Sequence, residues 1–326
     1  MPEPFFAVED LRVEYRTDDG VVHALDGVSY TLEQGEVLAI LGESGSGKTV
    51  HARAVMRILD SPPAFITGGS VRLDDAELLS LGEDDMRAVR GTRIAMLFQD
   101  PHTALDPVYT VGEQLIEVLR ERGGTSKREA RERAVGLLER VGIPSPGDRL
   151  RAYPHELSGG TAQRVMVAMA VALEPAVLLA DEPTSSLDVT VQAQVLELLA
   201  SLIAETQMAM VLITHNLAVA VGIADRIAVM YGGRIVELGP AREVFSGPKH
   251  PYTAALLRAI PDIRVREERL PAIEGAPPNL LRPPTGCAFH PRCPLADDRC
   301  RTEVPPMVEV HPERWSACFH PDEVTW

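Results

Sequence analysis

The sequence has no long apolar run, and this lack excludes several classes of protein. No stretch of its 326 residues approaches the length that a helix needs to cross a bilayer. The first residues, MPEPFFAVEDLRVEY, also lack the basic segment and apolar core of a signal peptide. We therefore expect neither a membrane span nor secretion, and we expect the chain to lie in the cytoplasm.

Positive charge and aromatic side chains are also scarce. The formal net charge is −15, and aromatic residues make up 5% of the chain. A polyanionic ligand needs a basic face, and single-stranded nucleic acid stacks on aromatic rings. We therefore expect no nucleic acid partner. The remaining composition, with 45% hydrophobic and 24% charged residues, is typical of a globular protein with one large domain or two small ones.

One short segment matches a phosphate-binding pattern, G-x-x-x-x-G-K-[ST], at every fixed position. This segment, called the phosphate loop below, consists of Gly42, Glu43, Ser44, Gly45, Ser46, Gly47, Lys48 and Thr49. A triphosphate needs a backbone without side-chain bulk that points several N–H groups inward, and the glycines permit this. Lys48 would bring positive charge to the outer phosphates, and the Thr49 hydroxyl would bind Mg²⁺.

The segments on either side of the phosphate loop support this interpretation. Residues 36–41 form an apolar run that predicts a buried strand, and residues 49–59 have the apolar spacing of a helix. The N-terminus of that helix would face the phosphates, where its N–H groups and dipole favour an anion.

The rest of the chain alternates strand-like and helix-like segments. Residues 17–20 are typical of a hairpin turn, and residues 110–170 predict a mostly helical insert with many charges between its apolar positions. Residues 191–205 predict an amphipathic helix. Further strands are expected at residues 68–73, 93–98, 177–180 and 210–213. Apolar strands that alternate with helices indicate an α/β fold with a largely parallel sheet.

Two carboxylates follow the strand expected at residues 177–180. Asp181 could bind Mg²⁺ at the end of the strand, and Glu182 could polarise the water that attacks the γ-phosphate. Alone, the pair could equally be a solvated acidic turn. Together with the phosphate loop, it favours ATP hydrolysis with Glu182 as the catalytic base.

A second candidate anion site precedes another expected helix, at residues 162–173. In Leu157-Ser158-Gly159-Gly160, Ser158 would cap the helix, and the glycines would let a phosphate approach the N–H groups at its start. Without further context, a structural helix cap is the better interpretation.

Taken in order, the phosphate loop, Gln99, the LSGG segment, Asp181-Glu182 and His215 resemble the ATP-binding cassette (ABC) family. In that family, the LSGG segment of one subunit closes over ATP held by the phosphate loop of the other. The resemblance covers about residues 5–250. It implies a P-loop NTPase ABC cassette with a RecA-like core, an antiparallel β subdomain and a helical subdomain at about residues 100–170.

The resemblance also implies roles for single residues. Tyr15 would stack on adenine, His215 would hydrogen-bond the γ-phosphate, and Asp188 would contact the opposite subunit. Gln99 would sense Mg²⁺ and the attacking water, and so would join Thr49 and Asp181 at the metal. Each of these residues has a plainer explanation when it is considered singly, but the ordered set favours the ABC interpretation.

One position departs from the family pattern. The family commonly has Gln directly after LSGG, whereas this chain has Thr161. The change leaves Ser158, Gly159 and Gly160 intact, so it affects only what this position contributes to closure over ATP.

Several longer segments resemble the ATP-binding subunits of dipeptide and oligopeptide importers, in particular the first of their two paired ATPases. They are GESGSGKTV, MLFQDPHTALDPVYTVGEQL, YPHELSGG, DEPTSSLDVTVQAQ, VMYGGRIVELGP and HPYTAALLRAIP. This resemblance implies a heterodimer with a related second ATPase, and two transmembrane permease subunits that dock near Gln99–Gln114. It also implies an external substrate-binding protein and a peripheral place on the cytoplasmic face of the membrane.

The C-terminal part, residues 261–326, holds 12 of the 26 prolines and all four cysteines. Prolines break helices, so we expect a loop-rich extension that follows a cassette at residues 1–260 and has little core of its own. The cysteines are Cys287, Cys293, Cys300 and Cys318, with the spacing C-x5-C-x6-C-x17-C. Disulfides are disfavoured in the cytoplasm, and four thiolates suit zinc or an iron–sulfur cluster. The spacing leaves the metal open.

This extension looks like that of peptide-importer ATPases, some of which bind a [4Fe–4S] cluster. On that resemblance we favour a [4Fe–4S] cluster over Zn²⁺, and a metal over none, with a structural or regulatory role.

Three alternatives stay open at this point. The cargo could be nickel, glutathione or another small solute, because other subunits select it. The chain could instead be a soluble ABC ATPase of repair or translation, although it lacks the long coiled coils or tandem cassettes usual there. The cysteines could form a redox sensor that gates transport.

Overall fold

The computed structural model describes residues 4–121, 124–185, 187–259 and 273–325. The chain forms two compact units. Unit 1 comprises the described parts of residues 1–32, 37–79 and 213–326, and unit 2 comprises those of residues 33–36 and 80–212. The boundary expected at residues 260–261 and Ser186 of the DEPTSSLD segment lie outside the described residues.

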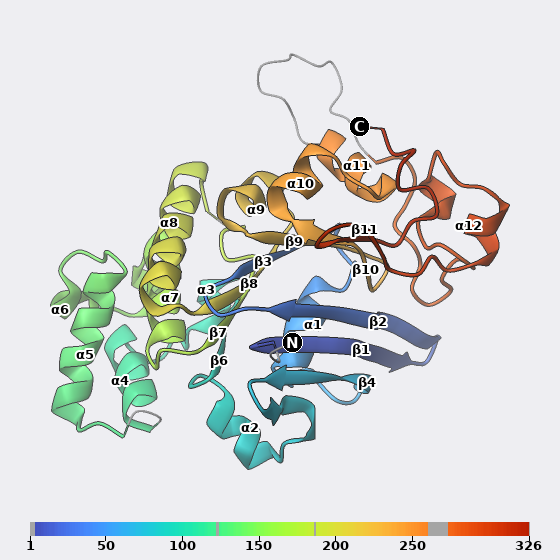
Figure 1. Ribbon diagram of the computed structural model, residues 1–326. Coiled ribbons are helices and arrows are strands. Elements are labelled where there is room, and N and C mark those ends of the chain that lie inside the picture. The colour runs from blue at the N-terminus through green and yellow to red at the C-terminus, as the bar shows by residue number, and fades with distance from the viewer. Residues whose placement is uncertain (1–3, 122–123, 186, 260–272, 326) are drawn as a thin grey trace. The chain divides into compact units, whose positions relative to one another are not determined.

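Unit 1 contains an antiparallel sheet with the strand order β2-β1-β4-β5 (Figure 1). Its strands are β1 (Phe6–Thr17), β2 (Gly20–Leu32), β4 (Ala64–Leu73) and β5 (Ala76–Glu77). Strands β1 and β2 form a hairpin in which Thr17 pairs with Gly20, so the expected turn is confirmed. Strand β4 begins four residues before the strand expected at residues 68–73, because Ala64 already pairs with Tyr15 of β1.

The other sheet of unit 1 carries the phosphate loop. Strand β3 (Val37–Leu41) is fully buried and pairs in parallel with β9 (Arg226–Tyr231), and β9 pairs antiparallel with β10 (Arg234–Pro240). The buried strand expected at residues 36–41 is therefore confirmed. Helices of this unit are α1 (Lys48–Val55), α9 (Leu217–Ile223), α10 (Ala241–Ser246) and α11 (Pro251–Arg258).

Helix α1 is shorter than the helix expected at residues 49–59. It ends at Val55 because Arg57 adopts a left-handed conformation with φ of 52°, which an α-helix cannot continue. Pro62 and Pro63 follow shortly after and supply no backbone N–H. The helix signal in the sequence therefore extended beyond the true end of the helix.

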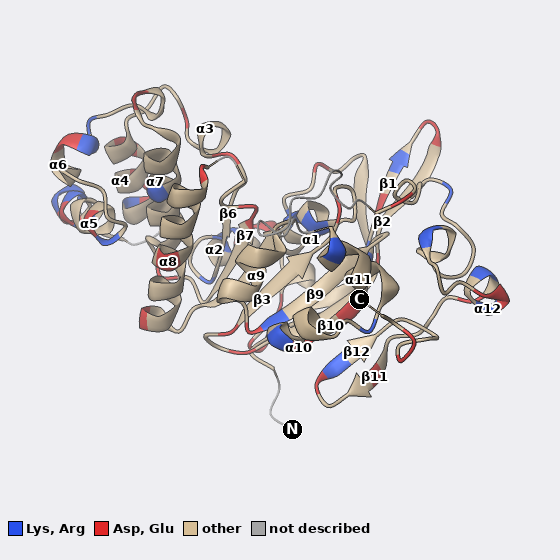
Figure 2. Ribbon diagram, turned by 90° about the horizontal axis from the view of Figure 1, so that it is seen from above, with Lys and Arg blue, Asp and Glu red and all other residues tan. Residues whose placement is uncertain are grey.

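Unit 2 joins a small parallel sheet to a group of helices. Strands β6 (Ile94–Leu97) and β7 (Val177–Asp181) pair in parallel, and β8 (Ala209–Thr214) enters the unit up to Leu212. The helices are α2 (Glu83–Val89), α3 (Pro101–Ala104), α4 (Val111–Glu121), α5 (Lys127–Arg140), α6 (Pro146–Arg149), α7 (Gly159–Val171) and α8 (Val189–Thr206). The helical character expected of residues 110–170 is thus confirmed. Figure 2 shows basic and acidic residues interspersed on α5, as in a solvated helix face.

The described part of the extension, residues 273–325, has only short elements. They are the 3₁₀ helix η3 (His290–Arg292), α12 (Asp298–Thr302), β11 (Val308–His311) and β12 (Arg314–Ser316). Strand β12 pairs antiparallel with β10 and with β11, so the extension continues a sheet of unit 1. Phe289 is buried among Tyr231 and Tyr252 of that unit. The expectation of a loop-rich segment that depends on a neighbouring core is confirmed. Within the described residues, every helix is too short or too polar to cross a bilayer.

Candidate functional site

The phosphate loop has the conformation that its glycines allow. It leaves the buried strand β3 and enters α1 through Gly47, whose φ of 107° is unfavourable for residues with a side chain. A Cβ atom at Gly42 would lie 2.3 Å from the carbonyl oxygen of Met230, so no side chain fits there. The loop is therefore a strand–turn–helix anion cradle of the kind that its sequence predicts.

Two polar side chains of the phosphate loop are buried within it. The Lys48 ammonium donates hydrogen bonds to the carbonyl oxygens of Gly42 (2.7 Å) and Glu43 (2.9 Å), so it lies over the loop. The Ser46 hydroxyl is 4% exposed and has no hydrogen-bond partner among the described residues. A buried polar group without a partner is costly, so its place here fits a loop that binds a polar ligand.

Tyr15 and His215 also belong to unit 1. Tyr15 is half-buried near the end of β1, where it pairs with Ala64. His215 follows β8 directly and is exposed, and Asn216 after it caps α9 by accepting from the N–H groups of Ala218 and Val219. Both residues thus lie in the unit that carries the phosphate loop.

The structure brings together Gln99 and Glu182 in unit 2. Strands β6 and β7 pair in parallel with Leu97 opposite Ala180, so the residues two positions beyond each of these meet at the same edge of the sheet. The Gln99 amide Nε2 donates to Glu182 Oε2 over 3.3 Å. Glu182 has a φ of 45°, a left-handed conformation that is unfavourable for this residue type and is often found at functional sites.

Asp181 ends strand β7 and is 3% exposed. Its carboxylate oxygens are ligands of the kind that a divalent cation favours. The phosphate loop belongs to unit 1, whereas Asp181 and Glu182 belong to unit 2.

Ser158 and Asp188 both cap helices, which for Ser158 is the plainer of the two interpretations given above. Ser158 begins α7 and accepts from the backbone N–H of Thr161, and Asp188 begins α8 and accepts from the N–H groups of Thr190 and Val191. Both side chains are exposed, so a cap does not prevent contact with another molecule. The Ser158 hydroxyl also lies 2.9 Å from the Thr161 hydroxyl.

All four cysteines line one cavity in unit 1. Cys300 is buried, and Cys287, Cys293 and Cys318 are half-buried. Backbone N–H groups two residues further along donate to three of the sulfurs; they belong to Phe289, Leu295 and His320. Burial outweighs these hydrogen bonds and raises the pKa of all four thiols, to about 11 for Cys293 and about 12 for Cys318. The cysteines, although spread over 32 residues, therefore converge.

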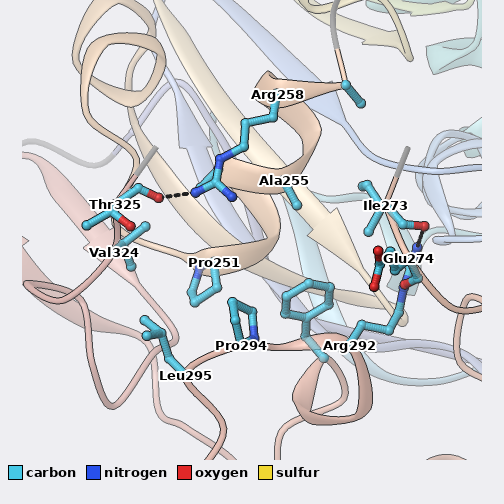
Figure 3. Close-up of a pocket in the computed structure, with 13 residues that line it drawn as sticks. Pro251, Ala255, Arg258, Ile273, Glu274, Arg292, Pro294, Leu295, Val324 and Thr325 are labelled. Atoms are coloured by element: carbon cyan, nitrogen blue, oxygen red, sulfur yellow. Dashed lines mark hydrogen bonds between the residues drawn. The ribbon is translucent and has the colours of Figure 1, made fainter. Parts of the chain in front are cut away.

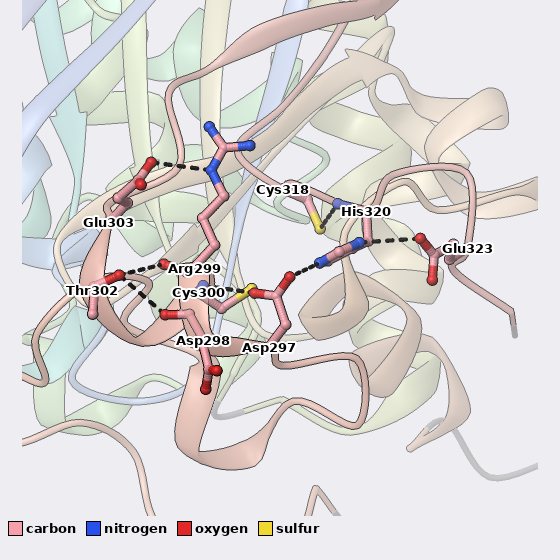
Figure 4. Close-up of polar contacts among 9 residues, drawn as sticks. All are labelled: Asp297, Asp298, Arg299, Cys300, Thr302, Glu303, Cys318, His320 and Glu323. Atoms are coloured by element: carbon pink, nitrogen blue, oxygen red, sulfur yellow. Dashed lines mark hydrogen bonds and ion pairs between the residues drawn. The ribbon is translucent and has the colours of Figure 1, made fainter.

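A polar group that the sequence did not predict adjoins this cavity. The His320 ring lies between the carboxylates of Asp297 and Glu323, at 3.1 Å from each (Figure 4). Asp297 also caps α12 by accepting from the N–H of Cys300, which holds the pKa of its carboxyl below the ordinary value. In the part of the chain that the structure describes, Asp297, Cys300 and His320 are the only group of three or more metal-ligand atoms that all lie within 4.8 Å of one another. No three cysteine sulfurs are that close.

Sequence reasoning also missed the partner of Glu43. Its carboxylate pairs with the Arg292 guanidinium, 249 residues away and next to Cys293. Arg292 lies in the segment Pro291-Arg292-Cys293-Pro294, but nothing in the sequence indicated that it contacts the phosphate loop.

Two family models match the chain. One, described as ABC transporter, matches residues 25–185, and the other, described as oligopeptide/dipeptide transporter C-terminal region, matches residues 236–300. The second match includes Cys287, Cys293 and Cys300.

Similar proteins cover nearly the whole chain. The dipeptide transport ATP-binding protein of Escherichia coli (strain K12) is 46% identical over 96% of this chain and 96% of its own length. The oligopeptide transport ATP-binding protein of the same strain is 48% identical over 97% of this chain and 93% of its own length.

Among solved structures, the ATP-binding cassette MJ0796, in a dimeric post-hydrolysis state with ADP and Pi, superposes with a TM-score of 0.65. It is 28% identical, and the match covers 73% of this chain and 99% of that one. The cbiO1 protein of Clostridium perfringens, part of the ABC transporter complex cbiONQ, gives a TM-score of 0.62 at 28% identity and covers 75% of this chain and 91% of its own.

Proposed function

This chain belongs to the ABC transporter family, among its ATP-binding subunits of peptide importers, and from that premise we propose how its residues act on ATP. Cassettes of this kind are ATPases, so the reaction is ATP + H₂O to ADP and phosphate. We propose that residues 1–260 form the cassette and residues 261–326 the extension. The cargo we propose is a dipeptide or oligopeptide, as in the names of the relatives.

Each residue of the proposed ATP site has its own role. The phosphate loop would hold the triphosphate, with Lys48 at its outer phosphates and Tyr15 on the adenine. Mg²⁺ would be held by Thr49, Asp181 and Gln99, and it would neutralise charge on the phosphates. His215 would hydrogen-bond the γ-phosphate. The unpartnered hydroxyl of Ser46 supports a polar ligand at this loop.

The observation that carries the catalytic proposal is the contact between Gln99 and Glu182. The Gln99 amide donates to Glu182 Oε2 and so orients the carboxylate, which is a group that can accept a proton from water. We therefore propose Glu182 as the general base and Gln99 as the residue that orients Glu182 and the water.

Glu182→Gln tests this assignment in the purified transporter complex. We expect ATP turnover to fall by about 100-fold or more, because a general base contributes that much, while ATP still binds. The exposed Glu197 on α8 gives a matched control, Glu197→Gln, with unchanged turnover. Normal turnover in Glu182→Gln would show that another group removes the proton.

We propose that a second, related ATPase completes the site. Ser158, Gly159, Gly160 and Asp188 would face the ATP held by that partner, because the N–H groups at the start of α7 favour an anion. Ser158 and Asp188 are exposed as this requires.

The proposed membrane partners are two permease subunits, which receive cargo from an external substrate-binding protein. Within Gln99–Gln114, the segment expected to dock them, Val108 is 70% and Tyr109 is 52% exposed. Large exposed apolar residues are typical of protein contacts. This assembly would place the chain on the cytoplasmic face of the membrane.

For the four cysteines we propose a [4Fe–4S] cluster in preference to Zn²⁺. Tetrahedral zinc with Zn–S bonds of about 2.3 Å needs sulfurs about 3.8 Å apart. The sulfurs line one cavity, but no three of them lie within 4.8 Å of one another in the described residues, which is a wider spacing than one Zn²⁺ with thiolate ligands requires. Backbone N–H groups on three sulfurs would stabilise thiolate ligands.

Metal analysis of anaerobically purified protein tests the cluster. We expect iron and acid-labile sulfide in equal amounts and a brown colour that is lost when all four cysteines are replaced by Ala. Stoichiometric zinc without sulfide would contradict the proposal.

A further inference from the structure

The phosphate loop and the cysteine-bearing extension meet at an ion pair between Glu43 and Arg292. Arg292 Nη1 donates to Glu43 Oε2 over 2.7 Å, and Nη2 donates to Glu43 Oε1 over 3.1 Å. The Arg292 side chain is 3% exposed and that of Glu43 is 24% exposed. A two-pronged contact of this kind fixes both orientation and distance.

The rest of the Arg292 guanidinium is held just as tightly. Its Nε donates to the carbonyl oxygen of Glu274 (2.9 Å), Nη2 to that of Ile273 (3.2 Å) and Nη1 to the Tyr231 hydroxyl (3.3 Å). Figure 3 shows the side chain at the wall of a cavity of about 500 Å³ that Phe289 also lines. Because these contacts fix the Arg292 guanidinium, the guanidinium holds the Glu43 carboxylate in place.

Glu43 is anchored through its backbone as well. Its N–H donates to the Tyr252 hydroxyl over 2.8 Å, and its carbonyl oxygen accepts from the Lys48 ammonium. The rings of Tyr231, Tyr252 and Phe289 pack against one another, and Phe289 lies between Cys287 and Cys293 in the chain. One contact network therefore runs from the cysteine-bearing segment to the loop that we propose for the triphosphate.

We propose that Arg292 is a positioning residue for ATP, which acts through Glu43 from outside the phosphate loop. Glu43 places a negative charge within a loop that must receive a polyanion, and Arg292 neutralises it and keeps it turned toward the extension. Without Arg292, that carboxylate would repel the triphosphate and the loop would lose its anchor. This inference rests on the proposed function, because it assumes that ATP binds at the phosphate loop.

Three variants of the full-length chain in its transporter complex test this role, with Mg·ATP as the probe. Arg292→Met keeps much of the side-chain volume but removes the charge, so we expect KM for ATP to rise about tenfold, with kcat changed less than about twofold. Glu43→Gln removes the carboxylate and is expected to leave KM equal or lower. In the double variant Arg292→Met with Glu43→Gln, KM should return to within about threefold of the wild type.

The directions of these changes in KM distinguish a positioning role of Arg292 from a merely structural one. If Arg292 only held the fold together, both single variants would weaken ATP binding and the double variant would be no better, which would overturn the proposal. An unchanged KM in Arg292→Met would also overturn it. Arg282→Met, at an exposed arginine of the same extension, is the matched control and should behave as the wild type.

Two further measurements distinguish a direct effect of Arg292 on ATP binding from other causes of a changed KM. Arg292→Met should keep the wild-type metal content and should stay folded at the assay temperature, although loss of the ion pair lowers its thermal midpoint; if KM rose only together with loss of the metal or of the fold, the direct role would be contradicted. Lys48→Ala, measured alongside, tests the proposed function itself. If Lys48→Ala abolishes ATP binding while Arg292→Met leaves KM unchanged, only the present inference fails. If Lys48→Ala has no effect, the proposed ATP site fails.

Discussion

The phosphate loop and the cysteine-lined cavity belong to the same unit, but different kinds of contact hold them in place. Lys48 bonds to carbonyl oxygens five and six residues away, and the loop follows a fully buried strand directly. The cavity, in contrast, is lined by residues from 250 to 320 and depends on pairs such as Arg314 with Glu237, 77 residues apart. The position of Lys48 over the loop is thus determined locally, although Glu43 has distant partners in Tyr252 and Arg292, whereas the cavity exists only when unit 1 is folded.

This difference indicates what each region can tolerate. A change at Lys48 should remove ATP chemistry and leave the extension intact, because the ammonium bonds to carbonyl oxygens of the loop itself. A change at a long-range contact of the extension should lower the stability of the whole unit, because that contact joins two parts of one core.

The largest expected effect comes from Lys48→Ala. Loss of the ammonium should lower ATP turnover by about 100-fold or more, since one preorganised charge at a reacting phosphate contributes that much. Iron and sulfide content should stay at the wild-type level. Steady-state ATPase assays and metal analysis check both points, with the exposed Lys127→Ala as the control. A parallel loss of metal would mean that the two regions are not held independently.

The features that could be predicted from the sequence are those that depend on nearby residues. Strands β3 and β7, the hairpin at residues 17–20 and the helical character of residues 110–170 were predictable, because each depends on nearby residues. The meeting of Gln99 and Glu182 was not visible from spacing alone; it needs the register of two parallel strands. The Arg292–Glu43 pair could not be predicted, because the two residues are 249 positions apart in the chain. The contact between His320 and Asp297 also joins short segments without periodicity, 23 residues apart.

The next effect in size concerns the buried pair of Arg314 and Glu237. Arg314 donates from Nη2 to Glu237 Oε1 over 2.8 Å, and the Glu237 carboxylate is fully buried. Arg314→Met would leave that charge uncompensated, so we expect the free energy of unfolding to fall by about 3 kcal/mol. Urea denaturation checks this, with Arg301→Met, at a side chain 58% exposed, as the control. Equal stability of the two variants would show that the extension is held by other contacts.

The smallest expected effect is on the pH dependence of stability, and it concerns a histidine in α1, the helix that follows the phosphate loop. His51 of α1 is fully buried and bonded to the Tyr30 hydroxyl, and burial lowers its pKa to about 4. The unfolded chain therefore binds a proton at His51 more readily than the folded chain does. The stability that the neutral ring contributes is complete above pH of about 6.5 and is lost as pH falls toward about 4.

His51→Gln should therefore flatten the pH dependence of the unfolding free energy in this range, by at most about 1.4 kcal/mol per pH unit. Denaturation at pH 7 and pH 5 measures the slope, and the exposed His311→Gln should leave it unchanged. An identical slope in His51→Gln would show that this histidine does not couple protonation to folding.

Strand β12 has one more consequence. It covers β10, so the outermost strand is β11, which is short and carries Glu309 and His311. A chain cut before residue 308 would present the backbone N–H and C=O groups of β10 to other molecules, and open strands of this kind join edge to edge. The extension thus gives the cassette a protected sheet margin, and we expect the shortened protein to self-associate where the full chain does not.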